Sequence, residues 1–170
     1  SGVGESVAKL FTEQGAKVLA VDINADGLES AMEGIENVVT MPQDITDSHA
    51  AENIIDTALQ NFSQIDILIN NAGRVIYSEV HELTDEIWNM HFDLNVGAAM
   101  RLCRRAIPEL KKRPVGRIVN IGSAVTLRSS PGLAGYTASK HALEGLTRVL
   151  SQELVPNITA NCIHPGTILS

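Results

Sequence analysis

The feature that most constrains the fold of this chain is the regular alternation of two kinds of segment. Five short apolar runs rich in β-branched residues predict strands, at residues 17–21, 38–41, 66–70, 117–121 and 158–163. Amphipathic segments with helical periodicity separate them, at residues 3–14, 25–34, 48–61, 85–112 and 136–154. Strands that alternate with helices specify a parallel sheet with right-handed crossovers and helices on both faces. The sequence therefore predicts a doubly wound, three-layer α/β/α fold.

Length and composition suit one globular domain over residues 1–170. A chain of 170 residues, 44% of them hydrophobic, can bury one sizeable core. The net charge of −7 argues against nucleic acid or an anionic membrane as a partner, because both attract basic surfaces. No apolar run approaches the ~20 residues of a membrane helix, so we expect a cytoplasmic protein.

The residues that commonly bind metals are scattered along the chain. Cys103 and Cys162 have no paired spacing, and the five histidines do not have the spacing of metal ligands. We therefore expect no metal site. His91 and Asp93 could support a site near Asn95, but we expect His91 to lie on a helix surface.

The loops that follow the predicted strands are where such a sheet binds its ligands. Gly2, Val3 and Gly4 open the first predicted helix, whose free N–H groups and positive dipole end suit a pyrophosphate. Asp22 ends the next strand, 18 residues beyond Gly4, close to where a dinucleotide site needs an acidic residue for a ribose hydroxyl. A carboxylate there repels the extra phosphate of NADP and favours NAD. The alternatives are an ordinary glycine turn and an Asp that caps or starts the following helix.

Two further polar loops follow strands at the same edge. Asp44, which precedes Ile45, could bind an adenine amino group, or it could start a turn in which Asp47 or Ser48 caps the next helix. The Asn-Asn-Ala-Gly run at 70–73 supplies amides and small residues for close packing, or it forms a plain Asx turn.

Tyr136 and Lys140 form the candidate catalytic pair. They lie four residues apart on a predicted helix and so share one face of it. A tyrosine phenol is protonated at neutral pH, but a neighbouring ammonium group stabilises the phenolate. Tyr136 could then exchange a proton with an alcohol or carbonyl oxygen, although the same spacing also occurs between ordinary surface residues.

Taken together, these segments resemble the short-chain dehydrogenase/reductase family over the whole chain. Ser-Gly-Val-Gly at 1–4 is similar to the second half of the family's Thr-Gly-x-x-x-Gly-x-Gly turn, and Asn-Asn-Ala-Gly at 70–73 matches a second motif. Asn95 matches the family's helix Asn, Ser123 its active-site Ser, and Tyr-Thr-Ala-Ser-Lys at 136–140 carries its Tyr and Lys. The His-Pro-Gly segment at 164–166 is similar to the one that runs beside the nicotinamide.

The resemblance implies a Rossmann-type domain and a role for each matched residue. Tyr136 is the general acid/base, and Lys140 stabilises its phenolate and binds the nicotinamide ribose. Ser123 polarises the substrate oxygen, and Asn95 holds a water that connects Lys140 to solvent. The residues expected to bind the cofactor are Gly2, Val3, Gly4, Asp22, Ile23, Asp44, Ile45, Asn71, Ala72, Gly73, Tyr136, Lys140, Pro165, Gly166, Thr167 and Ile168.

The function that we expect is an NAD-dependent oxidoreductase that interconverts a secondary alcohol and a ketone. One alternative keeps the fold but changes the reaction, giving an NAD-retaining epimerase or dehydratase. A non-catalytic NAD-binding scaffold is the other, because fold does not fix function.

The ends and the helix surfaces add two expectations. The family's first strand and its C-terminal segment are missing, so we expect the sequence to be an excerpt of a longer polypeptide. The helix at 136–154 has a leucine stripe with Ala138, Ala142 and Val149 beside it. The resemblance suggests that such helices pair between subunits, giving a homodimer or homotetramer.

Overall fold

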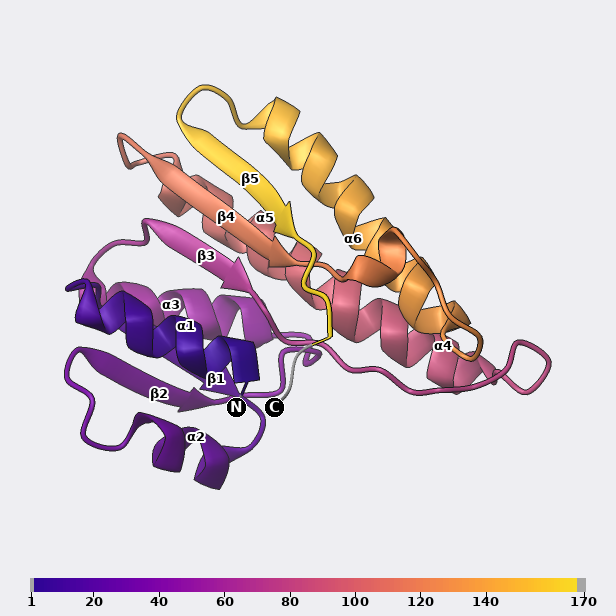
Figure 1. The fold of residues 1–170 in the computed structure, drawn as a ribbon. Helices are drawn as coiled ribbons and strands as arrows, with labels where there is room; N and C mark the ends of the chain where they lie inside the picture. The colour runs from indigo at the N-terminus through magenta and orange to yellow at the C-terminus, as the bar shows by residue number, and fades with distance from the viewer. Residues whose placement is uncertain (1, 168–170) are drawn as a thin grey trace. The chain divides into compact units, whose positions relative to one another are not determined.

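The computed structural model describes residues 2–167, which fall into two compact units, residues 2–64 and residues 65–167 (Figure 1). Both units contain parallel strands connected through helices, as the alternation predicts. The α/β fold class is therefore confirmed.

The first unit consists of three helices and a two-stranded parallel sheet. Its elements are α1 (Gly2–Glu13), β1 (Val18–Asp22), α2 (Ala25–Met32), β2 (Val38–Pro42) and α3 (Ala50–Phe62). Strand β1 pairs with β2 in a register that runs from Val18 opposite Val38 to Asp22 opposite Pro42. Ala8, Leu28 and Met32 form the centre of a small core against this sheet.

The start of α3 differs from the expectation that Asp47 or Ser48 caps this helix. The residue before the helix is His49, whose side chain makes no capping hydrogen bond. The Asp47 carboxylate instead accepts a hydrogen bond from Gln43 Nε2, at 3.0 Å. The carboxylate is thus engaged within the preceding turn, and the helix begins two residues later than predicted.

The second unit is built on a three-stranded parallel sheet. Its elements are β3 (Ile67–Asn70), α4 (Asp85–Phe92), the π-helical turn η1 (Asp93–Gly97), α5 (Ala98–Leu110), β4 (Gly116–Ile121), the 3₁₀ turn η2 (Ala124–Thr126), α6 (Ala134–Glu153) and β5 (Ile158–Ile163). The strands lie in the order β3-β4-β5. Helix α5 packs on β3 and β4, and α6 packs on β4 and β5, beside which it runs in Figure 1.

The single helix predicted over residues 85–112 is wrong in one respect, because the π turn η1 interrupts it. The Ala98 N–H bonds the carbonyl of Asp93, five residues earlier, in place of the usual four. Apolar periodicity does not reveal one widened turn, because the segments on either side stay helical. The interruption places Asn95 in the interior, where it is 2% exposed.

A buried chain of polar side chains connects the strand ends of this unit to α6. Asn70 and Asn120 lie opposite each other in β3 and β4, and Asn70 Nδ2 donates to Asn120 Oδ1 at 2.7 Å. Asn120 Nδ2 donates to the Thr147 hydroxyl at 2.8 Å, and that hydroxyl donates to the Leu143 carbonyl at 2.7 Å. Buried hydrogen bonds of this kind fix the register of neighbouring elements. Among residues 2–167, no helix is long and apolar enough to span a membrane.

Candidate active site

Tyr136 and Lys140 lie in the first turns of α6, on the same face of the helix. The Lys140 side chain is almost completely buried, at 3% exposed, and its Nζ lies 5.7 Å from the centre of the Tyr136 ring. Nζ donates a hydrogen bond to the Ile121 carbonyl at the end of β4, at 2.7 Å. Burial lowers the pKa of Lys140 to about 8, and the electrostatic interaction with Cys162 opposes this in part. The pair that the spacing predicted is therefore close in space, with an amine that can lose its proton near neutral pH.

Asn95 joins the π turn to the loop that follows β3. Its Oδ1 accepts a hydrogen bond from the Arg74 N–H at 3.1 Å, and its Nδ2 donates to the Arg74 carbonyl at 3.3 Å. The second N–H of Nδ2 goes to the Ser139 hydroxyl at 3.0 Å. Both N–H groups of the amide are thus used within the protein, and an acceptor position on Oδ1 is left for another donor.

Ser139 connects Asn95 to the residue that carries the candidate acid/base. Its hydroxyl is fully buried, accepts from Asn95 and donates to the Tyr136 carbonyl at 2.8 Å. The side chain of Asn95 and the backbone of Tyr136 are therefore joined through one hydroxyl group.

Gly73 lies in close contact with these groups. A Cβ atom at this position would lie 3.0 Å from Asn95 Oδ1 and 3.3 Å from Lys140 Nζ. Any larger residue would crowd both atoms. Glycine is therefore required here because Asn95 Oδ1 and Lys140 Nζ lie too close for a side chain.

Ser123 follows β4 and is held by the segment that follows β5. The Gly122 N–H bonds the Ile163 carbonyl at 2.7 Å, and the Ala124 N–H bonds the Pro165 carbonyl at 2.9 Å. His164 Nδ1 lies 3.1 Å from both the Ser123 carbonyl and the Thr126 hydroxyl. The Ser123 hydroxyl accepts from the Val125 N–H at 3.3 Å, which fixes its position at the start of η2.

His91 is not on a helix surface, and that expectation is wrong. The side chain, in the last turn of α4, is 0% exposed. Its Nε2 accepts a hydrogen bond from the Ile76 N–H at 3.1 Å, and its ring centre lies 6.2 Å from that of Tyr136. Burial lowers the pKa of His91, although the Ile87 carbonyl works in the opposite direction. Because His91 precedes Asn95 by four residues, the shared helix face was the signal that could have identified it.

The groups suited to a pyrophosphate and a ribose lie in the first unit. Gly2 has a φ of +61°, a conformation that favours glycine, at the point where α1 begins, and Val3 and Gly4 complete its first residues. Glu5, an acidic group in this turn, is paired with Lys9 at 2.5 Å, so its charge is offset locally. The N–H groups of this helix end therefore fit an anionic ligand.

Asp22 and Ile23 are exposed at the end of β1. Asp22 Oδ1 accepts from the Asn24 N–H at 3.0 Å, and Asn24, rather than Asp22, caps α2 through the Gly27 N–H. The carboxylate thus belongs to a turn, and its second oxygen remains exposed to a ligand. That arrangement fits a ribose hydroxyl.

Asp44 belongs to a turn after β2, although neither Asp47 nor Ser48 caps the helix that follows. Its Oδ1 accepts from the Thr46 hydroxyl at 2.7 Å and from the Thr46 N–H at 2.8 Å. These two bonds, the hydroxyl first, lower the pKa of Asp44. Ile45, the neighbouring residue, is half-buried.

The remaining predicted residues lie in the loops after β3 and β5. Asn71 and Ala72 directly follow β3, and Pro165, Gly166 and Thr167 follow β5. Ile168, also expected to contact the cofactor, lies outside the described residues. The second unit therefore brings together Gly73, Asn95, Ser123, Tyr136 and Lys140 with the loops at the carboxyl ends of its strands.

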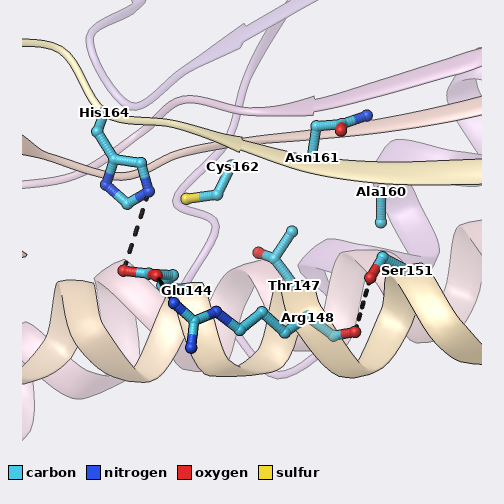
Figure 2. A pocket seen from close by; sticks show the side chains of 8 residues that line it. All are labelled: Glu144, Thr147, Arg148, Ser151, Ala160, Asn161, Cys162 and His164. Atoms are coloured by element: carbon cyan, nitrogen blue, oxygen red, sulfur yellow. Dashed lines mark hydrogen bonds and ion pairs between the residues drawn. The ribbon is translucent and has the colours of Figure 1, made fainter.

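A separate pocket of ≈ 210 Å³ lies between α6 and β5, and Figure 2 shows its lining. His164 Nε2 lies 3.9 Å from Glu144 Oε2 across it, and Glu144 also pairs with Arg148 along the helix. Its lining includes none of the predicted site residues. The part of the chain that the structure describes holds no group of three or more His, Cys, Asp or Glu residues that could bind a metal.

The sequence alone offered His91 only as the less favoured alternative, and it did not identify Ser139, Asn120 or Thr147 as parts of the site and its support. Asn120 had a detectable signal, because an Asn inside an apolar strand needs a buried partner. Ser139 had none beyond its place between Tyr136 and Lys140.

Comparison with known proteins agrees with the geometry. The short chain dehydrogenase family matches residues 1–170. The chain is 30% identical over 173 residues to the 3-oxoacyl-[acyl-carrier-protein] reductase FabG of Thermotoga maritima, covering 99% of this chain and 70% of that protein. It is 32% identical to human dehydrogenase/reductase SDR family member 4, covering 98% of this chain and spanning 62% of that protein's length.

Solved structures give the same result. The crystal structure of 3-ketoacyl-(acyl-carrier-protein) reductase from Brucella melitensis complexed with NADH superposes with a TM-score of 0.94 at 30% identity, over 98% of this chain and 71% of that one. An apo SCOR enzyme from Clostridium thermocellum gives 0.93 at 28% identity, over 99% and 70%. The chain therefore belongs to the short-chain dehydrogenase/reductase family of nicotinamide-dependent oxidoreductases, enzymes that act on CH–OH or keto groups.

Proposed function

We propose that this protein interconverts a secondary alcohol and a ketone with NAD as the cofactor, and that Tyr136 is its general acid/base. The observation that carries the proposal is the buried Lys140 ammonium, 5.7 Å from the centre of the Tyr136 ring. A cation with little water around it stabilises a nearby phenolate more strongly than an exposed one does.

Each side chain has a defined task in this proposal. When bound, the nicotinamide supplies the carbon that accepts or gives the hydride. In alcohol oxidation Tyr136 takes the hydroxyl proton as phenolate, and in ketone reduction it returns that proton as phenol. The Ser123 hydroxyl hydrogen-bonds the reacting oxygen, and Lys140 holds the nicotinamide ribose with donors that Ile121 does not use.

Proton exchange with solvent runs through Lys140 and Asn95. Asn95 has both N–H groups engaged, by Arg74 and Ser139, so a water bound there donates to Oδ1 rather than accepting from Nδ2. Gly73 has no side chain to cover these atoms, since a Cβ there would lie 3.0 Å from Oδ1 and 3.3 Å from Nζ. The nearness of both atoms to this one position supports a relay.

NAD is the proposed form of the cofactor because of Asp22. Its exposed carboxylate ends β1, and a ribose 2′-hydroxyl can donate to it, whereas a 2′-phosphate would be repelled. The proposed assembly is a homodimer or homotetramer that forms through helix surfaces, α6 among them.

The test is turnover by the purified protein with NAD and a panel of secondary alcohols, and with NADH and the matching ketones. Sugars, polyols, steroids and hydroxy acids belong to the panel, and β-keto thioesters join it because relatives carry the name 3-oxoacyl-[acyl-carrier-protein] reductase. Tight NAD binding without turnover of any compound would favour a binding scaffold.

Tyr136→Phe is the first variant to measure. It removes the transferable proton and keeps the ring, so we expect kcat to fall by a factor of about 100 or more while the NAD dissociation constant stays within about twofold. Tyr77→Phe, at an exposed tyrosine, is the matched control and should keep wild-type rates. Near-normal turnover in Tyr136→Phe would refute the proposed role.

A further inference from the structure

His91 lies behind the candidate acid/base, in a position that general core packing does not explain. Its ring is 0% exposed and lies edge-on to Tyr136, with ring centres 6.2 Å apart and planes at 62°. Gly135, the residue before Tyr136, packs directly on it, since a Cβ there would come within 2.8 Å of His91 Nδ1. The imidazole therefore occupies the space beside the Tyr136 backbone and forms one wall for its ring.

The same imidazole fixes the segment that passes in front of these helices. Residues 74, 76 and 78 donate their N–H groups to Asn95 Oδ1 at 3.1 Å, to His91 Nε2 at 3.1 Å and to the Gly132 carbonyl at 2.9 Å. Alternate residues of an extended chain point their N–H groups to the same side. His91 thus supplies the middle one of three anchors along this segment, between Asn95 and the loop that leads to Tyr136.

The ring must be neutral, with its proton on Nδ1, to play this part. Nε2 accepts from a backbone N–H, so it carries no proton, and the neutral ring then has its proton on Nδ1. A proton on Nδ1 also agrees with the influence of the Ile87 carbonyl, whose hydrogen bond raises the pKa of His91 against the larger effect of burial. The acceptor at Nε2 is what an apolar residue cannot provide.

We propose that His91 is a positioning residue for Tyr136: its Nε2 anchors the Ile76 backbone, and its ring sets the place of the phenol. The inference rests on the proposed function, in which the Tyr136 hydroxyl must meet the substrate oxygen. His91 touches neither substrate nor cofactor, and it acts through the segment at 74–78 and the start of α6.

The test compares two variants of nearly equal size. His91→Gln places an amide oxygen near the position of Nε2, whereas His91→Met has the same length and no comparable acceptor. We expect kcat to fall by about tenfold or more in His91→Met, because small misplacement of a reacting group is costly, and to stay within about threefold of the wild type in His91→Gln. The cofactor dissociation constant should be unchanged in both. His81→Met, at an exposed histidine, is the control for the substitution itself.

A purely structural role predicts a different pattern, in which both variants melt earlier and the folded fraction turns over normally. Equal kcat values in the two variants, whether high or low, would overturn the proposal. ¹⁵N shifts of the imidazole in the wild type give a second reading that needs no activity. They should show a pyridine-type Nε2 and a pyrrole-type Nδ1, and the reverse tautomer would overturn the proposal even if the methionine variant fails to fold.

The proposed function is tested separately from the role of His91. Wild-type turnover that Tyr136→Phe abolishes establishes it before His91 is judged. An inactive wild type would end both the proposed function and the catalytic part of this inference, whereas an active enzyme with an unaffected His91→Met ends the inference alone.

Discussion

Burial of Lys140 works against stability at neutral pH. A charged amine at 3% exposure has lost most of its hydration, and the Ile121 carbonyl replaces only part of it. The lowered pKa of about 8 is the measure of that loss. Because burial of this amine costs stability, the role of Lys140 lies in the candidate active site and not in core packing.

The burial of Lys140 predicts a specific pH dependence of stability. Its pKa is about 8 in the folded protein, against 10.5 as the ordinary value, so between these values the unfolded chain binds more protons than the folded one. The unfolding free energy contributed by this group therefore rises with pH across that window, and below about pH 8 the full penalty applies. Lys140→Met should lack this rise.

Urea unfolding of the wild type and of Lys140→Met at pH 7, 8, 9 and 10 measures the difference. The gap between the two curves should change steadily above pH 8, with the wild type gaining on the variant. Parallel curves would show that the amine is not buried in a charged state. Lys111→Met, at an exposed lysine, should leave the pH profile unaltered.

Asp22 is predicted to set the preference between NAD and NADP. Asp22→Ala removes an acceptor for the ribose hydroxyl and a charge that repels a 2′-phosphate. Since a hydrogen bond to a charged group contributes about 1.5–3 kcal/mol, the ratio of kcat/KM for NAD over NADP should fall by about tenfold or more. Asp26→Ala changes the same charge on α2 and is the matched control. An unchanged ratio would show that Asp22 only stabilises its turn and does not select the cofactor.

Among the elements, the π turn η1 has the clearest effect on the site. It turns Asn95 inward, where this one side chain holds both polar groups of the Arg74 backbone. Ser139 then couples Asn95 to α6. Three elements, the loop after β3, the π turn and α6, thus share one small hydrogen-bonded cluster beside Lys140.

Ser139→Ala is predicted to loosen this cluster without removing a catalytic group. The change leaves an Asn95 N–H unsatisfied, so we expect a loss of about 1–3 kcal/mol in unfolding free energy and a kcat lower by about tenfold, with little change in KM. Ser151→Ala is a close control, because Ser151 donates to the carbonyl three residues earlier just as Ser139 does, but it lies on another part of α6. Similar kinetics in the two variants would contradict the coupling through Asn95.

How much of these elements the sequence could predict depends on the kind of signal. All five strands were predicted to within one or two residues, because runs of β-branched residues between turn signals follow from local sequence. Gly15, with a φ of +84°, follows the end of α1 in the left-handed conformation that glycine favours. The π turn was missed, since the hydrogen bonds that accompany it join Asn95 to Arg74, 21 residues away in the sequence.

In the candidate site, too, features set by local sequence were predicted, and those set by tertiary contacts were missed. Tyr136 and Lys140 were identified because helix spacing is local and a family motif contains them. His91 was misplaced on a surface, because burial depends on which loop crosses the helix, and residues 74–78 have no periodic pattern. A polar residue on the helix face shared with a motif residue is a better indicator than polarity by itself.

At the scale of the whole molecule, the outer surface of α6 is a candidate contact between subunits. Leu143, Leu150 and Leu154 are buried within the second unit, whereas Val149 is 51% exposed. Gly145 is exposed, and a Cβ added there would meet no atom within 4 Å. The small residues Ala142 and Ala138 lie one and two turns before it, respectively, on the same side of the helix. This side of α6 is therefore open to close approach by another helix.

We predict that this side of α6 is part of the subunit interface of a homo-oligomer. In a two-fold interface the same residue approaches its own copy or a near neighbour, so a charge introduced there acts twice. Val149→Arg should shift the mass measured by light scattering after size exclusion from a dimer or tetramer to a smaller species, at protein concentrations where the wild type stays assembled. Gln60→Arg, at an exposed position of α3, adds the same charge elsewhere and should leave the mass unchanged. A wild type that is monomeric at all concentrations, or an assembled Val149→Arg, would place the interface on another surface or remove it.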